Sequence, residues 1–492
     1  MRGFVRLMAV VVTAAVFVVA CSKDKDSGKI TLDSPAVFFA QAGGSATVGF
    51  TAQNIKTLSA TSKPTGWDEA VVDLAGATIS VKAPSAEDIE SGDAVKTGSF
   101  SFTGYTPGGT LVSATLFAGI VTTKDISAEV ANSYIVTEPE TNYLIDATRK
   151  SDGSQLATSY VDVVWQTASG FVQYADFEDG KASFYIGADS DDATKIKQGN
   201  AVIGAYDADG ELIWSWHIWA TDYDPDAEGG TVDFNGYTLM NRNLGALAND
   251  NSTTDKILAS YGLYYQWGRK DPFTSAGTFT IINEDYSYQV DGERPIYNIL
   301  NEELPKMRTR AEYHGTIAKS LRNPAVFYAM TYNFTGETDE YGQEIVLNDY
   351  RTKDWTDVSN DDYWGGVSGK KTIYDPCPVG YKVPTCDKDG NTPYAWLVYA
   401  DMTWDDTNHG ATQNGQWFPA AGTRVYASGG LDHQELNPYG GMWIGTAGKA
   451  SANIEEYPEL YGQYMFIVNG KRTFKVSKDA RSQGMSMRCV KE

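Results

Sequence analysis

Side chains that could carry out catalysis are present in this chain, but they show no recognised catalytic spacing. There are 63 acidic residues and four histidines. The histidines are His217, His314, His409 and His433. They are far apart in the sequence and have no metal-ligand spacing, and neither a GxSxG nucleophile elbow nor an HExxH zinc motif occurs. Two carboxylates can hydrolyse a glycosidic bond, yet no acidic pair is distinguished by its context. We therefore expect no enzymatic activity and no cofactor.

An acidic segment at residues 222–233 is the best candidate for a metal site. Aspartates occupy positions 1, 3, 5 and 12 of a loop that resembles a calcium-binding loop. Position 6, which needs glycine for its sharp turn, is Ala227, and position 12 is Asp233 rather than the longer glutamate. The segment is better interpreted as a solvated linker between domains, and the prediction is that the protein has no metal site.

Aromatic residues form a second candidate site, for a sugar rather than for catalysis. Flat rings stack on sugar faces and bury a large area per residue. Four aromatic residues near the glycine turns at 429–430 and 440–441 are candidates for binding a glycan: Trp404, Trp417, Tyr439 and Trp443. The alternative is that these rings fill the core of a domain rich in loops.

Another aromatic cluster, at residues 213–219, is predicted to be structural. Alternation places Trp214 and Trp216 on one face of a strand and Trp219 on the other. Both faces are therefore apolar, which is typical of a buried strand. His217 in this strand is expected to be a hydrogen-bonded core histidine and not a ligand.

The four cysteines have different expected roles. Residues 1–20 carry two arginines, an apolar run and the ending Val-Val-Ala before Cys21, which is typical of a lipoprotein signal peptide. Cys21 would then be the lipidated first residue of the mature protein, and residues 21–29 a polar tether. The alternative is an ordinary secretory signal. An exported chain can form disulfides, and Cys377 could pair with Cys386 or with Cys489.

Composition indicates several domains and excludes some partners. A chain of 492 residues is expected to contain two to four domains. Its formal charge of −23 disfavours nucleic acid and anionic membrane surfaces, because a phosphate backbone requires clustered lysine and arginine.

The pattern of residues along the chain predicts a mainly β protein. Alternating strands at 47–52, 78–83 and 99–102, with glycine and proline turns between them, predict an immunoglobulin-like β-sandwich over 30–123. Further strands predict a second β-sandwich over 125–229. The remaining residues, 231–492, have two short helices, near residue 253 and from residue 316 to 321, and long segments without periodicity.

Four segments in the last part of the chain resemble a known family. They are YDPCPVGYKVPT at 374–385, GMSMRCV at 484–490, NGYTLMNRNLGA at 235–246 and YGLYYQWGRK at 261–270. In this order they resemble the Fibrobacter succinogenes major paralogous domain of Bacteroidetes surface lipoproteins. The resemblance implies an α+β, C-type-lectin-like fold over 231–492 and a disulfide between Cys377 and Cys489. The turn at residues 442–446 departs from the family pattern.

The N-terminal module has a weaker resemblance. With Trp67 near its middle, it is similar to the Bacteroidetes carbohydrate-binding-often-N-terminal module. Exposed aromatics are not concentrated in it, so a spacer role is preferred over glycan binding.

These observations predict a non-catalytic, lipid-anchored protein that faces outward from the outer membrane. Its expected partner is a glycan or a surface protein, bound by the last domain in an adhesin-like role. Two alternatives remain, namely a fimbrial tip or accessory subunit and a glycan-degrading enzyme.

Overall fold

The computed structural model describes most of the chain. The described residues are 26–234, 237–279, 292–307, 312, 314–329, 333–338, 344–347, 354–366, 368–386, 403–405, 407, 409–413, 415–432, 439–448, 461–468 and 473–492. The predicted signal peptide at residues 1–20, the lipidation site Cys21 and the tether up to residue 25 lie outside them.

The first unit is a sandwich of two four-stranded sheets, with strand orders β1-β3-β6-β5 and β2-β8-β7-β4. Its strands are β1 (Lys29–Leu32), β2 (Ala36–Phe39), β3 (Ser45–Gln53), β4 (Thr57–Ser62), β5 (Val71–Asp73), β6 (Thr78–Lys82), β7 (Thr97–Tyr105) and β8 (Leu111–Ile120). Alternate residues of both sheets fill one core around Trp67, whose indole nitrogen donates to the Val95 carbonyl over 2.8 Å. A single-turn helix, α1 (Ala86–Glu90), begins at a capping box on Ser85.

The second unit also has two four-stranded sheets, with orders β10-β16-β15-β12 and β13-β14-β11-β9. Its strands are β9 (Thr122–Asp125), β10 (Ser133–Val136), β11 (Thr141–Asp146), β12 (Tyr160–Gln166), β13 (Val172–Glu178), β14 (Lys181–Ile186), β15 (Gly199–Tyr206) and β16 (Leu212–Ala220). As expected from its two apolar faces, β16 is buried on both sides, with Trp214, Trp216 and Trp219 inaccessible to solvent. The chain enters this unit at Thr122, because β9 pairs in parallel with β11.

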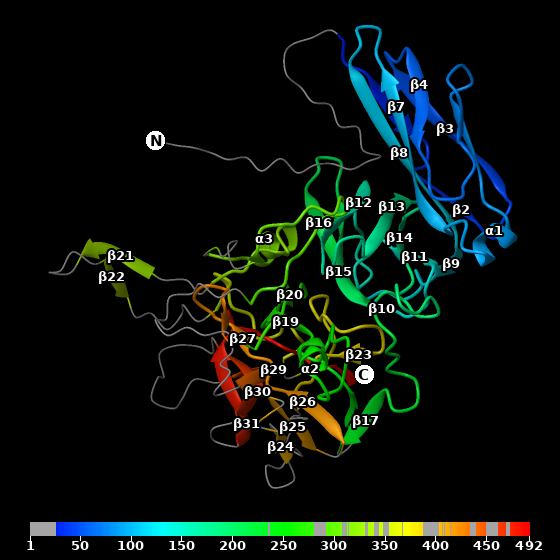
Figure 1. Cartoon of the computed structure of the whole chain (residues 1–492). Helices are drawn as coiled ribbons and strands as arrows, with labels where there is room; N and C mark the ends of the chain where they lie inside the picture. Colours follow the sequence, from blue (N-terminus) through cyan, green and yellow to red (C-terminus); the bar gives the residue numbers. More distant parts are fainter. Residues whose placement is uncertain are drawn as a thin grey trace.

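Aromatic residues fix the junction between the first two units. Phe117 from β8 stacks on Tyr174 from β13, with ring centroids 5.7 Å apart, and also contacts Tyr185 from β14. The first unit lies at one end of the molecule (Figure 1).

The last part of the chain consists of many short strands around an aromatic core. One sheet has the order β17-β18-β33-β23 and another β20-β19-β32-β27-β28. The strands of these two sheets are β17 (Thr231–Phe234), β18 (Tyr237–Met240), β19 (Leu263–Gln266), β20 (Phe273–Thr274), β23 (Tyr381–Lys382), β27 (Thr423–Arg424), β28 (Leu431–Asp432), β32 (Gly484–Met485) and β33 (Val490–Lys491). The remaining strands are β21 (Asn333–Thr338), β22 (Glu344–Leu347), β24 (Thr403–Asp405), β25 (Gly410–Gln413), β26 (Gln416–Pro419), β29 (Tyr439–Gly448), β30 (Tyr461–Val468) and β31 (Thr473–Ala480).

Both helices predicted in this part are present. The helix α2 (Thr254–Ala259) is capped by Thr253, and α3 (Ile317–Arg322) by Thr316. Each threonine side chain accepts a hydrogen bond from the backbone three residues later. None of the described helices is long and apolar enough to cross a membrane.

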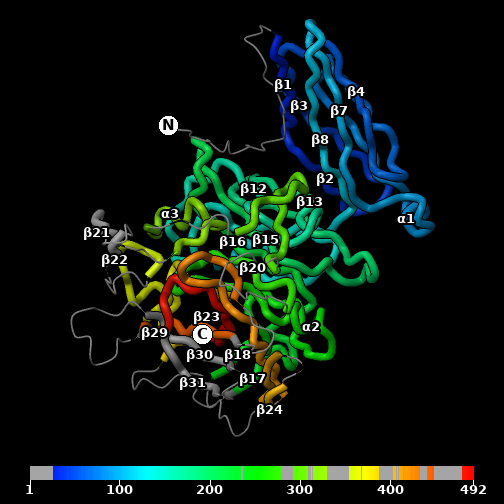
Figure 2. Tube along the Cα trace, turned by 60° about the vertical axis from the view of Figure 1, so that its left-hand side comes forward, coloured from blue at the N-terminus to red at the C-terminus, as the bar shows by residue number. Residues whose placement is uncertain are grey.

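The second and last units share one hydrophobic core. Trp165, Val202 and Trp219 from the second unit belong to the same buried cluster as residues such as Trp267 and Trp443. The last strand reaches this body through Val490, which is buried, while the final two residues, Lys491 and Glu492, are exposed at its surface (Figure 2). The chain is therefore mainly β, as predicted. The main core of the segment from residue 231 onward is shared with the second unit, and a smaller cluster around Phe418 and Met442 lies wholly within that segment.

Buried ion pairs hold the loops of the last unit. Arg424 donates to Glu293 over 2.7 Å, and Arg481 lies 3.5 Å from Asp354. Lys270 donates to Asp271 over 2.6 Å and also to the Ser215 hydroxyl on β16. Removing one member of such a pair leaves an uncompensated buried charge, which is strongly destabilising.

Asp162 on β12 predicts a pH dependence of stability. Burial raises its pKa to about 7 from an ordinary value near 3.9. Below the ordinary value both the folded and unfolded states are protonated. As the pH rises toward 7 the unfolded state ionises first, so the free energy of unfolding should fall by at most about 4 kcal/mol and then level off. Asp162→Asn should remove the part of the fall that Asp162 contributes, which urea titrations of the variant and the unchanged protein between pH 4 and 8 would measure. An unchanged pH profile in the variant would contradict this assignment.

Candidate functional site

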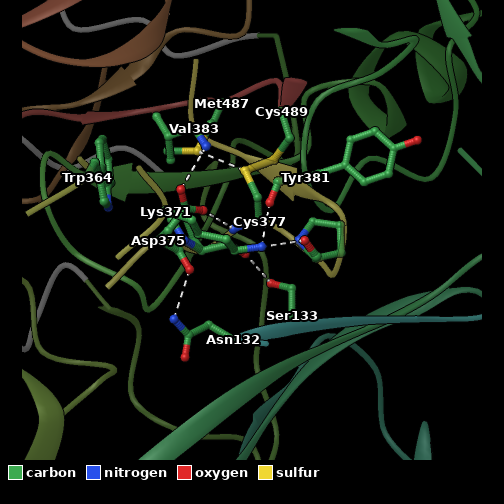
Figure 3. The surroundings of a disulfide bond; sticks show 12 residues. Asn132, Ser133, Trp364, Lys371, Asp375, Cys377, Tyr381, Val383, Met487 and Cys489 are labelled. Carbon is green, nitrogen blue, oxygen red and sulfur yellow. Dashed lines mark hydrogen bonds between the residues drawn. A yellow bond between two sulfur atoms is a disulfide. The ribbon is translucent and has the colours of Figure 1, made fainter. Parts of the chain in front are cut away.

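A disulfide joins Cys377 to Cys489, with Cα atoms 6.1 Å apart (Figure 3). Cys386 is buried and forms no disulfide. Of the two pairings that the sequence left open, the structure therefore has the one implied by the family resemblance, and the pairing of Cys377 with Cys386 is wrong. The bond closes 112 residues of chain and lies beside β33, the last strand.

Asp375 organises the turn that carries Cys377. Its buried carboxylate accepts backbone hydrogen bonds from Cys377 and Val383, each over 2.9 Å. Desolvation by burial raises the pKa of Asp375 to about 6, while the nearby Lys371 ammonium acts in the opposite direction. Lys371 in turn donates to the Pro378 carbonyl over 2.7 Å. These contacts hold residues 375–383 in one conformation although the segment has little regular structure.

Residues at the start of β10 bind the same turn from the second unit (Figure 3). The Asn132 amide donates to the carbonyls of Ile373 and Asp375, over 2.7 and 2.8 Å. The Ser133 hydroxyl donates to the Pro376 carbonyl over 2.6 Å. Both side chains are buried. We call this junction, from residues 132–133 to residues 373–376, the seam.

His217 continues the seam into the interior. Its Nδ1 lies 3.0 Å from the Ser133 hydroxyl, and its Nε2 lies 2.9 Å from the Asn200 side-chain oxygen. Asn200 donates to the Gly245 carbonyl over 3.0 Å. Burial lowers the pKa of His217 to about 3. The histidine is thus a hydrogen-bonded core residue, as the sequence predicted, and it links the second unit to the last one.

A cavity of about 240 Å³ opens beside the seam. The second unit contributes residues of β10 and β11 to its wall, and the last unit contributes Tyr381 and Val379. The acidic residues that line the cavity are Glu129, Asp224 and Asp226, and Lys124 lines it as well.

The floor of this cavity is held by hydrogen-bonded tyrosines. The hydroxyl of Tyr134 donates to the Glu129 carbonyl over 2.8 Å, and that of Tyr381 to the Asp226 carboxylate over 3.1 Å. Lys491 on β33 also donates to Asp226, over 2.9 Å, and these two hydrogen bonds lower the pKa of Asp226. The cavity therefore has the carboxylate of Asp226 on a wall fixed by the C-terminal strand.

Two of the four aromatic residues predicted to bind a glycan are buried. Trp417 is 3% exposed and Trp443 is 0% exposed. Their indole nitrogens donate inward, to the Ser260 hydroxyl over 3.0 Å and to the Tyr265 carbonyl over 2.6 Å. A ring that is buried and bonded in this way cannot stack on a sugar, so the prediction for these two residues was wrong.

The other two residues predicted to bind a glycan, Trp404 and Tyr439, give no support to the prediction. Trp404 is half-buried and packs against the cluster that contains Phe418 and Met442. The backbone of Tyr439 lies in β29, but its side chain lies outside the described residues.

The acidic segment at 222–233 is structural where its contacts are described. Asp226 is bonded to Tyr381 and Lys491, as above, and Tyr223 donates to the Gly230 carbonyl over 2.7 Å. Among the described residues, no group of three or more histidine, cysteine, aspartate or glutamate side chains could hold a metal ion.

The residues that form the seam were not found from the sequence. Asn132 and Ser133 lie where the connection from β9 enters β10, about 240 positions from the carbonyls that they bind. The available signal was the segment at 374–385, whose rigidity indicated a fixed turn but not its partner.

Comparisons with known proteins do not assign this arrangement. No protein-family model matches the chain, and no curated protein matches its sequence. Similar segments occur in an endo-β-1,4-glucanase from Bacillus licheniformis (12% identity, TM-score 0.14, 39% of this chain and 38% of that one). They also occur in SGBP-B of the Bacteroides ovatus mixed-linkage glucan utilization locus, in complex with a mixed-linkage heptasaccharide (9% identity, TM-score 0.11, 38% of this chain and 42% of that one). A third example is the Yersinia pseudotuberculosis adhesin InvE (12% identity, TM-score 0.13, 60% of this chain and 94% of that one). At these TM-scores the likenesses carry no argument about fold or function.

Reduction of the disulfide should destabilise the shared body of the second and last units and leave the first unit unchanged. For a loop of about 100 residues, reduction should lower the free energy of unfolding by no more than roughly 4 to 5 kcal/mol, because the unfolded chain gains conformational entropy when the loop opens. Peptide mapping without reductant should recover Cys377 linked to Cys489 and Cys386 as a thiol. Denaturant titrations with and without reductant would measure the loss. A linkage that includes Cys386, or a loss confined to the first unit, would contradict the structure.

Proposed function

We propose that this protein is a non-catalytic, lipid-anchored surface protein that binds a glycan or a surface protein in an adhesin-like role. In this proposal residues 231–492 form a C-type-lectin-like domain of the Fibrobacter succinogenes major paralogous family, and the first two units are immunoglobulin-like spacers. The anchor is Cys21, and the protein faces outward from the outer membrane.

The cavity beside the seam is the observation that supports the binding role. Its volume of about 240 Å³ is somewhat below the usual range of about 300 to 1,000 Å³ for sites that hold drug-sized ligands. Oxygen acceptors at its edge suit a ligand with several hydroxyl groups, such as one terminal sugar unit, because each hydroxyl can donate to a carboxylate. This cavity is now the proposed binding site, in place of the four aromatic residues that the sequence suggested.

The position of the cavity also favours binding. Its wall combines a regular sheet of the second unit with a turn that a disulfide, Asp375 and Lys371 hold in place. A site built on such rigid elements loses little conformational freedom when it binds its ligand.

The anchor is tested by Cys21→Ala. The acyl chains at this residue are proposed to supply the membrane attachment. The variant should therefore move from the membrane fraction to the soluble fraction of the cells that express it. Unchanged retention in the membrane fraction would contradict the lipoprotein assignment.

The binding site is tested by filling the cavity. Val379 is 42% exposed and lies in the cavity wall, so Val379→Trp should block the cavity without disturbing the core. On a glycan array, residues 26–492 should bind a defined set of glycans. Val379→Trp should lose at least about tenfold in affinity, which corresponds to 1.4 kcal/mol. Asp224→Asn should weaken the same interactions because it removes a charged acceptor.

Asp209→Asn is the matched control, since Asp209 is an exposed aspartate in a turn that does not line the cavity. It should bind as the unchanged protein does. Equal binding by Val379→Trp and the unchanged protein would show that the cavity is not the site. Cleavage of a bound glycan would show that the protein is an enzyme.

A further inference from the structure

The described chain begins at one end of the first unit, where Asp26 is tied to a hairpin. The hairpin joins β7 to β8, and its tip comprises residues 105–111. The Asp26 carboxylate accepts hydrogen bonds from the Gly108 backbone and the Thr110 hydroxyl, each over 3.1 Å, and from the Thr106 hydroxyl. Asn54 donates to the same carboxylate over 3.3 Å. The path of the chain before residue 26 therefore starts at this tip.

The tip has two exposed apolar side chains that face the same side of the sheet. Tyr105 is 45% exposed and Leu111 is 55% exposed. They are directly opposite each other in the antiparallel pair of β7 and β8, so their side chains lie on one face. The turn between them is exposed except for Thr106.

The charge of this end differs from that of the whole protein. The segments that meet here are residues 26–30, 51–57 and 104–112, and their charged residues are Asp26, Lys29 and Lys56. The Asp26 carboxylate is occupied by four hydrogen bonds, whereas both lysines are exposed. In a chain with 63 acidic and 40 basic residues, this end is thus mildly basic.

The tip lies opposite the rest of the molecule. The strand β8 runs from Leu111 at the tip to Ile120, directly before β9 of the second unit. Ten residues of strand span roughly 30 Å. Both views show the hairpin at the end of the first unit that is farthest from the last unit (Figures 1 and 2).

We propose that the tip of the β7–β8 hairpin rests in the headgroup region of the bilayer that holds the lipid anchor. The inference depends on the proposed anchor at Cys21. Four residues separate Cys21 from Asp26, and this link of five Cα–Cα steps reaches at most about 17 Å when fully extended. The acyl chains therefore bring the tip to the membrane surface. A tyrosine and a leucine beside lysines suit this boundary, because amphipathic rings and lysine side chains are favoured there.

The consequence is a fixed orientation. With the tip on the membrane, the first unit stands upright and places the seam cavity away from the lipid. The first unit would then be held in a defined orientation by its contact with the membrane, rather than act as a spacer on a free tether.

Tryptophan quenching by brominated lipid tests this orientation. Leu111→Trp places a new ring at the tip, and Val95→Trp is the matched control, because Val95 is 43% exposed and lies at the opposite end of β7. Ten of the native tryptophans are buried and so contribute little quenching. Each full-length acylated variant would be purified in detergent and reconstituted into vesicles of phosphatidylcholine brominated near the headgroup.

The expected result is loss of the added emission for Leu111→Trp and none for Val95→Trp. Tyr105→Trp repeats the measurement at the neighbouring position in case Leu111→Trp does not fold. If the vesicles float with bound protein but neither tip tryptophan is quenched, the tip does not rest on the membrane, and only the lipid anchor is supported. Equal quenching at both ends would overturn the upright orientation. If the protein does not float with the vesicles, both the lipid anchor and the membrane contact of the tip are ruled out.

Discussion

The closure of the C-terminal strand onto the turn at 374–383 is the constraint on which most of this structure depends. The last unit has many short strands and long connections, which cannot by themselves fix a chain in one arrangement. The disulfide between Cys377 and Cys489 joins the turn to the end of the chain, and β33 then pairs with both β18 and β23. The last strand thus closes a sheet that begins more than 240 residues earlier.

The same turn determines how the second unit is attached. Its carbonyls receive the side chains of Asn132 and Ser133, and Trp219 of the second unit lies in the core of the last one. Separation would exchange these hydrogen bonds for hydrogen bonds to water and would expose the apolar core that Trp219 shares with the last unit, so it is opposed mainly by the loss of apolar burial. Residues of both units line the cavity at the seam, so the cavity exists only while the two units are joined.

Much of the local structure could be predicted from the sequence, but the long-range contacts could not. The alternation in residues 47–52 and 213–219 predicted β3 and β16. The helices expected near residue 253 and over 316–321 correspond to α2 and α3. Each of these signals depends on neighbours along the chain. The burial of Trp417 and Trp443 depends on contacts with Ser260 and Tyr265, more than 150 residues away. Composition cannot distinguish a buried tryptophan from one that binds a sugar, so the prediction for Trp417 and Trp443 was wrong. The seam was not predicted.

The central claim is that the second and last units form one cooperative body through the seam. Hydrogen exchange in increasing denaturant measures it most directly, because it resolves the opening free energy of each strand. The backbone amides of β10, β16 and β33 should become exchangeable in a single transition with one free energy. If β10 and β16 remained protected in denaturant that already opened β33 and the turn at 374–383, the two units would unfold independently, and the seam would not join them into one cooperative body.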